Sequence, residues 1–197
     1  IKDTIAVPYL IQVMKDKTNP ESVRWEAVRS AGIIRDERVI PYLWKILVND
    51  ESEEMRAIAA MSLGCMGNKI RDRVEDLIEC FNGEKSYKVK EKMLWTLGAT
   101  RDKRVIPILI EWARSPIAIE AIKNIGGKEA KQALITLLAH KDEWVRVDAV
   151  KALVSMEDKS VIPKIEEAMR NTGNKQAKKV MKEYLERLEK VEDRIRR

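Results

Sequence analysis

The segment Ile34–Leu43 reads IRDERVIPYL, and it returns almost unchanged at Thr100–Leu109 as TRDKRVIPIL. A third copy, DKSVIPKI, spans Asp158–Ile165, and the chain opens on a fourth, IKDTIAVPYL, at Ile1–Leu10. With two looser copies, six apolar anchor residues recur 25 to 34 residues apart: Leu10, Leu43, Leu77, Leu109, Leu134 and Ile165. Self-similarity at such a period is the sequence signature of a repeat architecture.

A second motif lies between these copies. Val23–Gly32 reads VRWEAVRSAG and aligns with MRAIAAMSLG at Met55–Gly64, and looser versions span Val89–Gly98, Ile117–Gly126 and Val145–Val154. Its apolar residues recur at helical spacing, and its Gly is typical of a helix C-terminus. A column of aspartates stands before the first motif, where side chains cap helix N-termini: Asp3, Asp36, Asp102 and Asp158.

Each repeat therefore predicts a helix A, a short turn and a helix B. We expect helix A at 4–16, 37–49, 71–82, 103–114, 128–140 and 160–171. We expect helix B at 20–32, 51–66, 87–99, 116–126, 143–156 and 174–196. No segment alternates with period two over the length of a strand, so no sheet is expected.

The pattern Asp-x-Arg-Val-Ile-Pro-x-Leu, followed by Val-Arg-x-x-Ala-x-x-x-Leu-Gly, resembles HEAT repeats, specifically the short class named after phycobilin lyases. The resemblance covers essentially the whole chain and implies an all-α, right-handed α-solenoid of about six helical hairpins, with the B helices on the concave side. We expect one domain, with a repeat array at 1–173 and a C-terminal capping helix at 174–197. The apolar stripe of that helix is Val180, Tyr184, Leu188, Val191 and Ile195.

Composition excludes several classes of protein. In 197 residues, 45% are apolar and 36% are charged, and the longest uncharged stretch is only Ala57–Asn68, so no membrane-spanning helix is expected. Cys65 and Cys80 are too few for a disulfide scaffold and suggest reduced thiols in a cytoplasmic protein. His140, the single histidine, has no metal-ligand spacing around it, so we expect no metal and no cofactor. The abundance of Lys, Glu, Arg and Ile is compatible with a thermophilic source.

The repeat alignment separates core columns from variable ones on helix B. A column of basic residues, Arg24, Arg56, Lys90 and Arg146, is expected to pair with acids of neighbouring turns rather than with a ligand. Variable columns would face the concave side, and an exposed Trp and Met there are typical of a protein-binding hot spot. The predicted partner-binding residues are Trp25, Arg29, Met61, Trp95, Lys92, Lys123, Asp148 and Lys151.

We therefore expect a non-enzymatic interaction scaffold that binds a protein or peptide through its concave face. The alternative is nucleic-acid binding by a basic patch, with Trp95 stacking on a base; its residues are Lys85, Lys88, Lys90, Lys92, Arg101, Lys103 and Arg104. A remote third option is a DNA-glycosylase-like enzyme using Trp144 and Asp148, which rests on fold alone.

Two irregularities remain. The spacing from Leu109 to Leu134 is only 25 residues, because Ser115-Pro116 leaves almost no loop, and a shorter repeat is expected to change the local twist. The chain also begins inside a turn and without Met, so we expect residues upstream of Ile1. The net charge of +6 is concentrated in the basic window of the third repeat and in residues 174–197, which carry nine basic and five acidic side chains.

Overall fold

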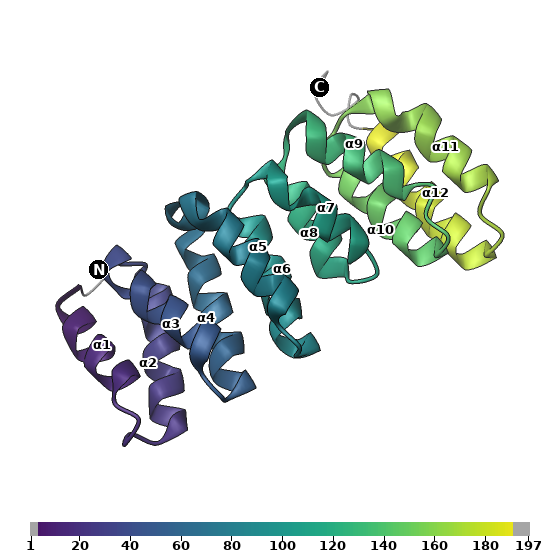
Figure 1. Ribbon diagram of the computed structural model, residues 1–197. Helices are drawn as coiled ribbons and strands as arrows, with labels where there is room; N and C mark the ends of the chain where they lie inside the picture. The colour runs from purple at the N-terminus through teal and green to yellow at the C-terminus, as the bar shows by residue number, and fades with distance from the viewer. Residues whose placement is uncertain (1–3, 191–197) are drawn as a thin grey trace. The chain divides into compact units, whose positions relative to one another are not determined.

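The computed structural model describes residues 4–190, and every regular element in that range is a helix. The chain folds as two compact units, Ile1–Val105 and Ile106–Arg197, each with its own hydrophobic core. Figure 1 shows the helices in chain order as successive hairpins. None of the helices within residues 4–190 is long and apolar enough to cross a bilayer. The predicted all-α solenoid of helical hairpins is confirmed.

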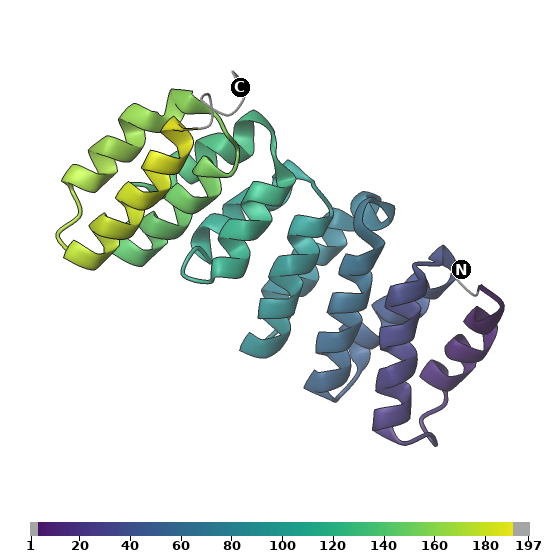
Figure 2. The same ribbon diagram turned by 180° about the vertical axis from the view of Figure 1, so that it is seen from behind.

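Unit 1 contains three hairpins, each made of an A helix and a B helix. The A helices are α1 (Val7–Lys15), α3 (Ile40–Asn49) and α5 (Val74–Gly83), and the B helices are α2 (Glu21–Ile34), α4 (Glu53–Met66) and α6 (Tyr87–Ala99). Short 3₁₀ turns lead into the A helices: η1 (Thr4–Ala6), η2 (Glu37–Val39) and η3 (Gly67–Arg73), with η4 (Lys103–Val105) at the end of the unit. Helix α4 packs between α2 and α6, and Figure 2 shows these three B helices side by side.

Unit 2 repeats this arrangement. Its A helices are α7 (Ile106–Glu111), α9 (Gly127–Leu137) and α11 (Ile162–Arg170), the last preceded by η5 (Lys159–Val161). Its B helices are α8 (Pro116–Ile125), α10 (Glu143–Val154) and α12 (Lys175–Glu189). Helix α10 packs between α8 and α12, so the B helices again form one row.

The helix boundaries follow the sequence prediction closely, and α6 has the predicted bounds. The main differences are at helix ends. Helix α7 ends at Glu111 instead of residue 114, because the tight turn to Ser115 takes up its last residues. Helix α12 is described as far as Glu189, and residues 191–196 of the predicted helix lie outside the described part of the chain.

The aspartate column caps the turns that begin the A helices, as predicted. Asp36 accepts a hydrogen bond from the backbone N–H of Arg38, Asp102 from that of Arg104, and Asp158 from that of Ser160. Asp3 lies outside the described residues. A proline follows in the first turn of α3 and of α11, where its missing N–H costs no hydrogen bond.

The prediction that the repeated glycine ends helix B is wrong in unit 1. Gly32 and Gly64 lie inside α2 and α4, and left-handed Arg35 (φ 58°) ends α2 instead. A Cβ on Gly32 would lie 2.9 Å from the Cα of Ser62, so the glycine lets two B helices approach closely. The Ser62 hydroxyl then donates to the Val28 carbonyl oxygen at 2.9 Å. In α8 the prediction holds, because Gly126 (φ 70°) is its C-cap.

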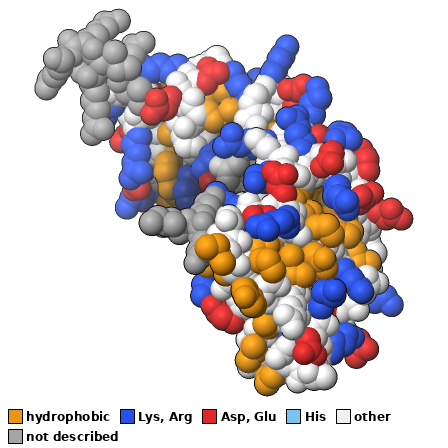
Figure 3. Space-filling view, turned by 90° about the vertical axis from the view of Figure 1, so that its left-hand side faces the viewer, with side chains coloured by type: hydrophobic (Ala, Val, Ile, Leu, Met, Phe, Trp, Pro, Cys, Tyr) orange, Lys and Arg blue, Asp and Glu red, His pale blue; other side chains and the backbone are white. Residues whose placement is uncertain are grey.

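The predicted anchor residues are buried in every repeat except the first. Leu43, Leu77, Leu109, Leu134 and Ile165 are at the core, whereas Leu10 is only half-buried. Figure 3 looks from the side on which α1 lies and shows hydrophobic side chains gathered there. Ile5 and Tyr9 are strongly exposed on η1 and α1. The α1 end of unit 1 therefore leaves part of its apolar surface uncovered.

Helix α12 packs against α10 and α11, but with a different stripe from the one predicted. Its buried side chains are Ala177, Met181, Leu185 and Leu188. Val180 and Tyr184 are only half-buried, so the helix is rotated relative to the prediction, and Val191 and Ile195 lie outside the described residues. Ala177 and Met181 thus lie on the buried side of α12, which packs against α10.

Candidate functional site

The exposed side chains of the B helices in unit 1 form a surface that we call the helix-B face. Met61 on α4 and Trp95 on α6 are each 40% exposed, and they lie on adjacent helices of this face. Trp25 on α2 is half-buried and Arg29 beside it is exposed. Lys92, one turn before Trp95, is half-buried. Five of the predicted partner-binding residues thus lie on three adjacent helices of one unit.

The position of Trp95 is fixed by a glycine of the neighbouring helix. An added Cβ on Gly64 would lie 2.3 Å from Cζ3 of the indole, so the ring lies directly over this glycine. Met61 lies one turn before Gly64 on the same helix. The neighbouring Thr96 hydroxyl donates to the Ala60 carbonyl oxygen at 2.7 Å and holds α6 against α4. One side of the indole therefore packs against the backbone of α4 at Gly64, while the side chain remains 40% exposed to solvent.

The charges on the helix-B face are largely balanced. Arg29 forms an ion pair with Glu26 at 2.5 Å, and this hydrogen bond lowers the pKa of the Glu26 carboxyl. Lys92 lies 3.7 Å from the carboxylate of Glu91. The surface around Trp95 therefore combines apolar side chains with charged side chains that are paired with opposite charges, and it does not carry an excess of positive or negative charge.

The other three predicted partner-binding residues come together in unit 2. Lys123, Asp148 and Lys151 line a shallow hollow of about 90 Å³ between α8 and α10. Burial raises the pKa of the Asp148 carboxyl, although Lys151 acts in the opposite direction. Lys123 forms an ion pair with Glu120 at 2.5 Å. Trp144, one turn before Asp148, is 51% exposed.

The basic patch predicted for nucleic acid is divided by the length of helix α6. Lys85 and Lys88 lie at its N-terminal end, whereas Arg101 and Lys103 follow its C-terminal end. At 1.5 Å per residue, a helix of this length separates the two groups by about 18 Å. Lys88 is also paired with Glu54 at 2.7 Å. The patch is therefore spread along the whole of α6, with Lys90 and Lys92 on the helix between the two groups.

The predicted pairing of the helix-B basic column with acids of neighbouring turns is confirmed for two arginines. Arg24 pairs with Asp50 at 2.5 Å and Arg56 with Glu84 at 2.8 Å. Burial disfavours ionisation of Glu84, but hydrogen bonds from Arg56 and from two backbone N–H groups lower its pKa overall. These pairs link each repeat to the next one.

Sequence reasoning missed the clefts that these arginines line. One cavity of about 740 Å³ contains Arg56, Glu84, Trp44 and Cys80, and smaller ones of about 190 and 410 Å³ contain Arg24 and Arg146. Cys80 is half-buried on the wall of the 740 Å³ cavity, and burial raises the pKa of its thiol. The column of basic residues on helix B was the signal in the sequence, because its arginines line all three clefts.

Metal-ligating side chains do not cluster in the described part of the chain. No three His, Cys, Asp or Glu residues within residues 4–190 are placed to hold one metal ion. His140 instead accepts a hydrogen bond from the backbone N–H of Asp142 through Nδ1 at 3.0 Å. Its position in the turn before α10 gives it a structural role.

Solved structures with the same fold are similar over most of their length. The chain resembles the YibA protein of Escherichia coli with 17% identity and a TM-score of 0.56, covering 95% of this chain and 82% of that one. It also resembles a chain in the complex of CpcE and CpcF of phycocyanin lyase from Nostoc sp., with 20% identity and a TM-score of 0.57, covering 93% and 76%. At these identities the likeness shows the fold alone. No curated protein matches the chain in sequence.

The expectation that the chain is not an enzyme is wrong as an inference from its fold. The similar structure from Nostoc belongs to a lyase, so this architecture is compatible with enzymatic activity.

The family assignment rests on the sequence as well as on the fold. The model of the HEAT repeats matches residues 1–64, 43–117 and 116–186, which together span nearly the whole chain. The matched segments contain the hairpins described above. The chain therefore belongs to the HEAT-repeat family.

Proposed function

We propose that the chain binds a protein or peptide segment through the helix-B face of unit 1, with Trp95 and Met61 as the apolar contacts. HEAT repeats are typical of protein-interaction scaffolds, and the observation that carries this proposal is the exposure of both side chains on a supported surface. An aromatic ring held in place before binding loses little conformational entropy when a partner covers it.

The surroundings of these two residues favour a particular kind of partner. Their polar neighbours are already paired, so a highly charged ligand gains little there. We infer a segment with an apolar anchor residue that packs on the indole and polar residues that lie along the paired rim. The Nostoc neighbour comes from a complex of two proteins, which is consistent with this class of function.

Nucleic-acid binding is less well supported. Lys85 and Lys88 lie at the opposite end of α6 from Arg101 and Lys103, and Lys88 is engaged by Glu54. Binding through phosphates would weaken steeply as salt increases, whereas binding to an apolar anchor would change little. Titrations at low and high salt therefore separate the two functions.

The experiment uses peptides selected from a random phage-displayed library against the full chain. Affinities of the selected peptides are then measured for the unchanged protein and for Trp95→Ala and Met61→Glu. We expect Trp95→Ala to weaken binding by about tenfold or more, as hot-spot tryptophans do. Trp95→Phe should recover part of the affinity, because it restores an aromatic surface over Gly64.

Trp144→Ala is the matched control, since Trp144 is also an exposed tryptophan on a B helix but lies in unit 2. Circular dichroism shows whether each variant keeps its helices. Unchanged affinity in both Trp95→Ala and Met61→Glu, or an equal loss in Trp144→Ala, would refute the proposed site.

A further inference from the structure

One position in the repeat supplies the acid that pairs with the helix-B arginine of the preceding repeat. It lies two residues before the side chain that caps the next B helix. Asp50 stands two residues before the cap Ser52, and Glu84 stands two residues before the cap Ser86. In the last repeat the cap is Asn174, and the corresponding residue is Thr172.

Arg56 shows what a complete version of this arrangement looks like. Its Nε and one terminal nitrogen donate to the two oxygens of Glu84, at 2.8 and 3.2 Å. Its other terminal nitrogen donates to the carbonyl oxygens of Asp50 and Glu51, both at 3.0 Å. Each of the three nitrogens of this guanidinium therefore has a partner within the protein.

Arg146 occupies the same position in unit 2 but lacks this carboxylate. Thr172 is buried and its hydroxyl donates to the Ala168 carbonyl oxygen at 2.8 Å, so it does not replace the acid. One terminal nitrogen of Arg146 donates to the His140 carbonyl oxygen at 2.7 Å, as in the complete arrangement. Its Nε has no partner, although the side chain is 90% buried. The Nε of Arg24 also lacks a partner, but a terminal nitrogen of Arg24 pairs with Asp50, a carboxylate that has no counterpart at Thr172.

Glu143 only partly makes up for the missing acid. Its Oε1 accepts from the other terminal nitrogen of Arg146 at 2.9 Å, but also from the backbone N–H of Gly173 at 2.7 Å. The corresponding glutamates Glu21 and Glu53 likewise bind the start of the next B helix, through Ser52 and Ser86. Glu143 therefore keeps its usual task and shares one oxygen with the arginine.

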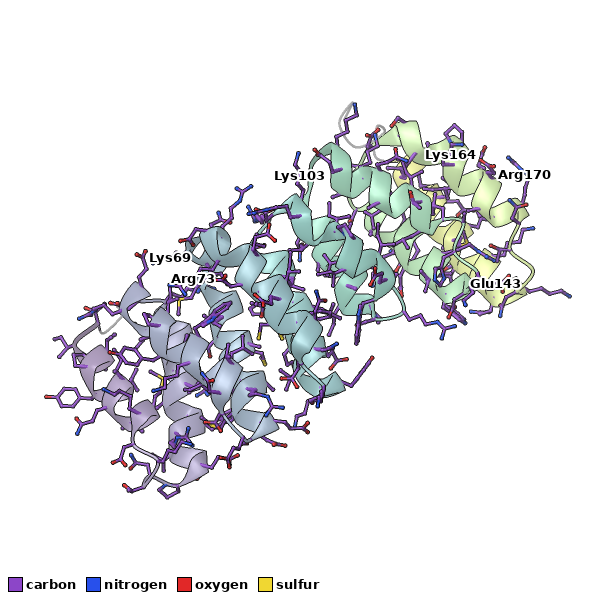
Figure 4. The ribbon with its side chains drawn as sticks, viewed as in Figure 1. Lys69, Arg73, Lys103, Glu143, Lys164 and Arg170 are labelled. Carbon is purple, nitrogen blue, oxygen red and sulfur yellow. The ribbon has the colours of Figure 1, made fainter. Side chains whose placement is uncertain are left out.

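Arg146 lines the cavity of about 410 Å³ between α9 and α11. Its other walls are apolar (Ile135, Leu138, Ala139 and Ala168) and polar (Gln132, Lys164, Glu167 and Asn171). Figure 4 shows Lys164 near the start of α11, with Arg170 at its other end and Glu143 beside the loop leading to α12. The wall thus combines an apolar surface, amide groups, Arg146 and one carboxylate, Glu167, which is paired with Lys164 at 3.3 Å, around a space large enough for a small organic molecule.

We propose that this cleft binds a small organic carboxylate with an apolar body. The carboxylate enters from the cavity and pairs with the guanidinium of Arg146, the role that Asp50 and Glu84 have in the sister repeats. The apolar body packs on the α9 wall, and the amides of Gln132 and Asn171 offer further hydrogen bonds. The site is separate from the helix-B face of unit 1, so neither proposal depends on the other.

Hexanoate is a suitable probe because it joins a carboxylate to an aliphatic chain, and hexanamide is its uncharged counterpart. The arginine Nε–H resonances of the full chain are followed by NMR during titration with each compound. We expect hexanoate to shift the Arg146 resonance progressively until the site is saturated. Hexanamide should have a much weaker effect, because it carries no charge. The Arg56 resonance should not move, because its partners are in place.

Two matched variants test the replacement directly. Thr172→Glu introduces the carboxylate of the sister repeats and should weaken hexanoate binding by about tenfold or more. Thr172→Gln has nearly the same size without the charge and should keep the affinity. Ala139→Leu, a substitution at an exposed position on the cavity wall, gives a third readout that does not depend on the buried Thr172, and it should weaken binding by filling the cleft.

The proposal fails if hexanoate leaves the Arg146 resonance unchanged. It also fails if hexanoate binds Thr172→Glu as well as it binds Thr172→Gln, or if Ala139→Leu binds as tightly as the unchanged protein. The proposed function is untouched by these results, since its readout is peptide affinity at Trp95.

Discussion

At the residue scale, the repeated glycine of helix B shows how the lack of a side chain lets neighbouring helices of a solenoid pack closely. Gly32 and Gly64 are in helix interiors, where glycine is unfavourable by about 1 kcal/mol relative to alanine. At both positions, however, the next B helix leaves no room for a Cβ. The cost in helix propensity is offset by close packing and by the hydrogen bond from Ser62 to Val28.

Gly32→Ala is therefore expected to destabilise the protein, by about 1–3 kcal/mol, because the new methyl group meets the backbone of Ser62. Chemical denaturation followed by circular dichroism measures the change. Gly83→Ala is the control: nothing lies within 4 Å of its added Cβ, so this change should be neutral or slightly stabilising. Equal effects at the two positions would show that packing against α4 is not the reason for Gly32.

At the element scale, the A helices depend on the polar turns that precede them. Asp36 and Asp158 both cap such turns with their side chains. Hydrogen bonds from Arg38 lower the pKa of Asp36 to about 2, and hydrogen bonds from Lys131 and Ser160 lower that of Asp158 to about 2. Folding therefore stabilises the charged form of both carboxylates relative to the unfolded chain.

This predicts a loss of stability in acid. A carboxyl group whose pKa falls on folding stabilises the fold at a pH above its unfolded value of about 3.9, and the effect disappears as the pH falls toward 2. Asp158→Asn should make the unfolding midpoint less dependent on pH between about 4 and 2. Asp72→Asn, at an exposed position in η3, should leave the pH profile as it is. Identical profiles for the two variants would contradict this role of the cap.

The elements also show why the sequence predicted some features and not others. The aspartate caps and the prolines act locally, so their spacing was sufficient to place the starts of the A helices. The role of Gly32 depends on a residue thirty positions later, and a glycine near a helix end suits a C-cap equally well. The stripe of α12 was misplaced for a similar reason, because its rotation is set by the fit against α10.

At the scale of the whole molecule, the repeat made the family and the fold predictable, but it is much less informative about function. The columns that repeat are those that build the hairpins, and a binding surface consists of positions that differ between repeats. Trp95 and Met61 could be selected in this way, whereas the cleft of Arg146 could not. Arg146 stands out because Thr172 replaces the acid that pairs with the arginine in the sister repeats. The role of that acid is seen only in the structure, from the hydrogen bonds between Arg56 and Glu84.

The most direct test of the proposed binding face uses the indole N–H resonances of the five tryptophans. Three of them belong to unit 1 (Trp25, Trp44 and Trp95) and two to unit 2 (Trp112 and Trp144). On addition of a selected peptide to the full chain, we expect the Trp95 resonance to shift most and the Trp144 resonance to stay in place. A shift of Trp144 with Trp95 unmoved would contradict the account.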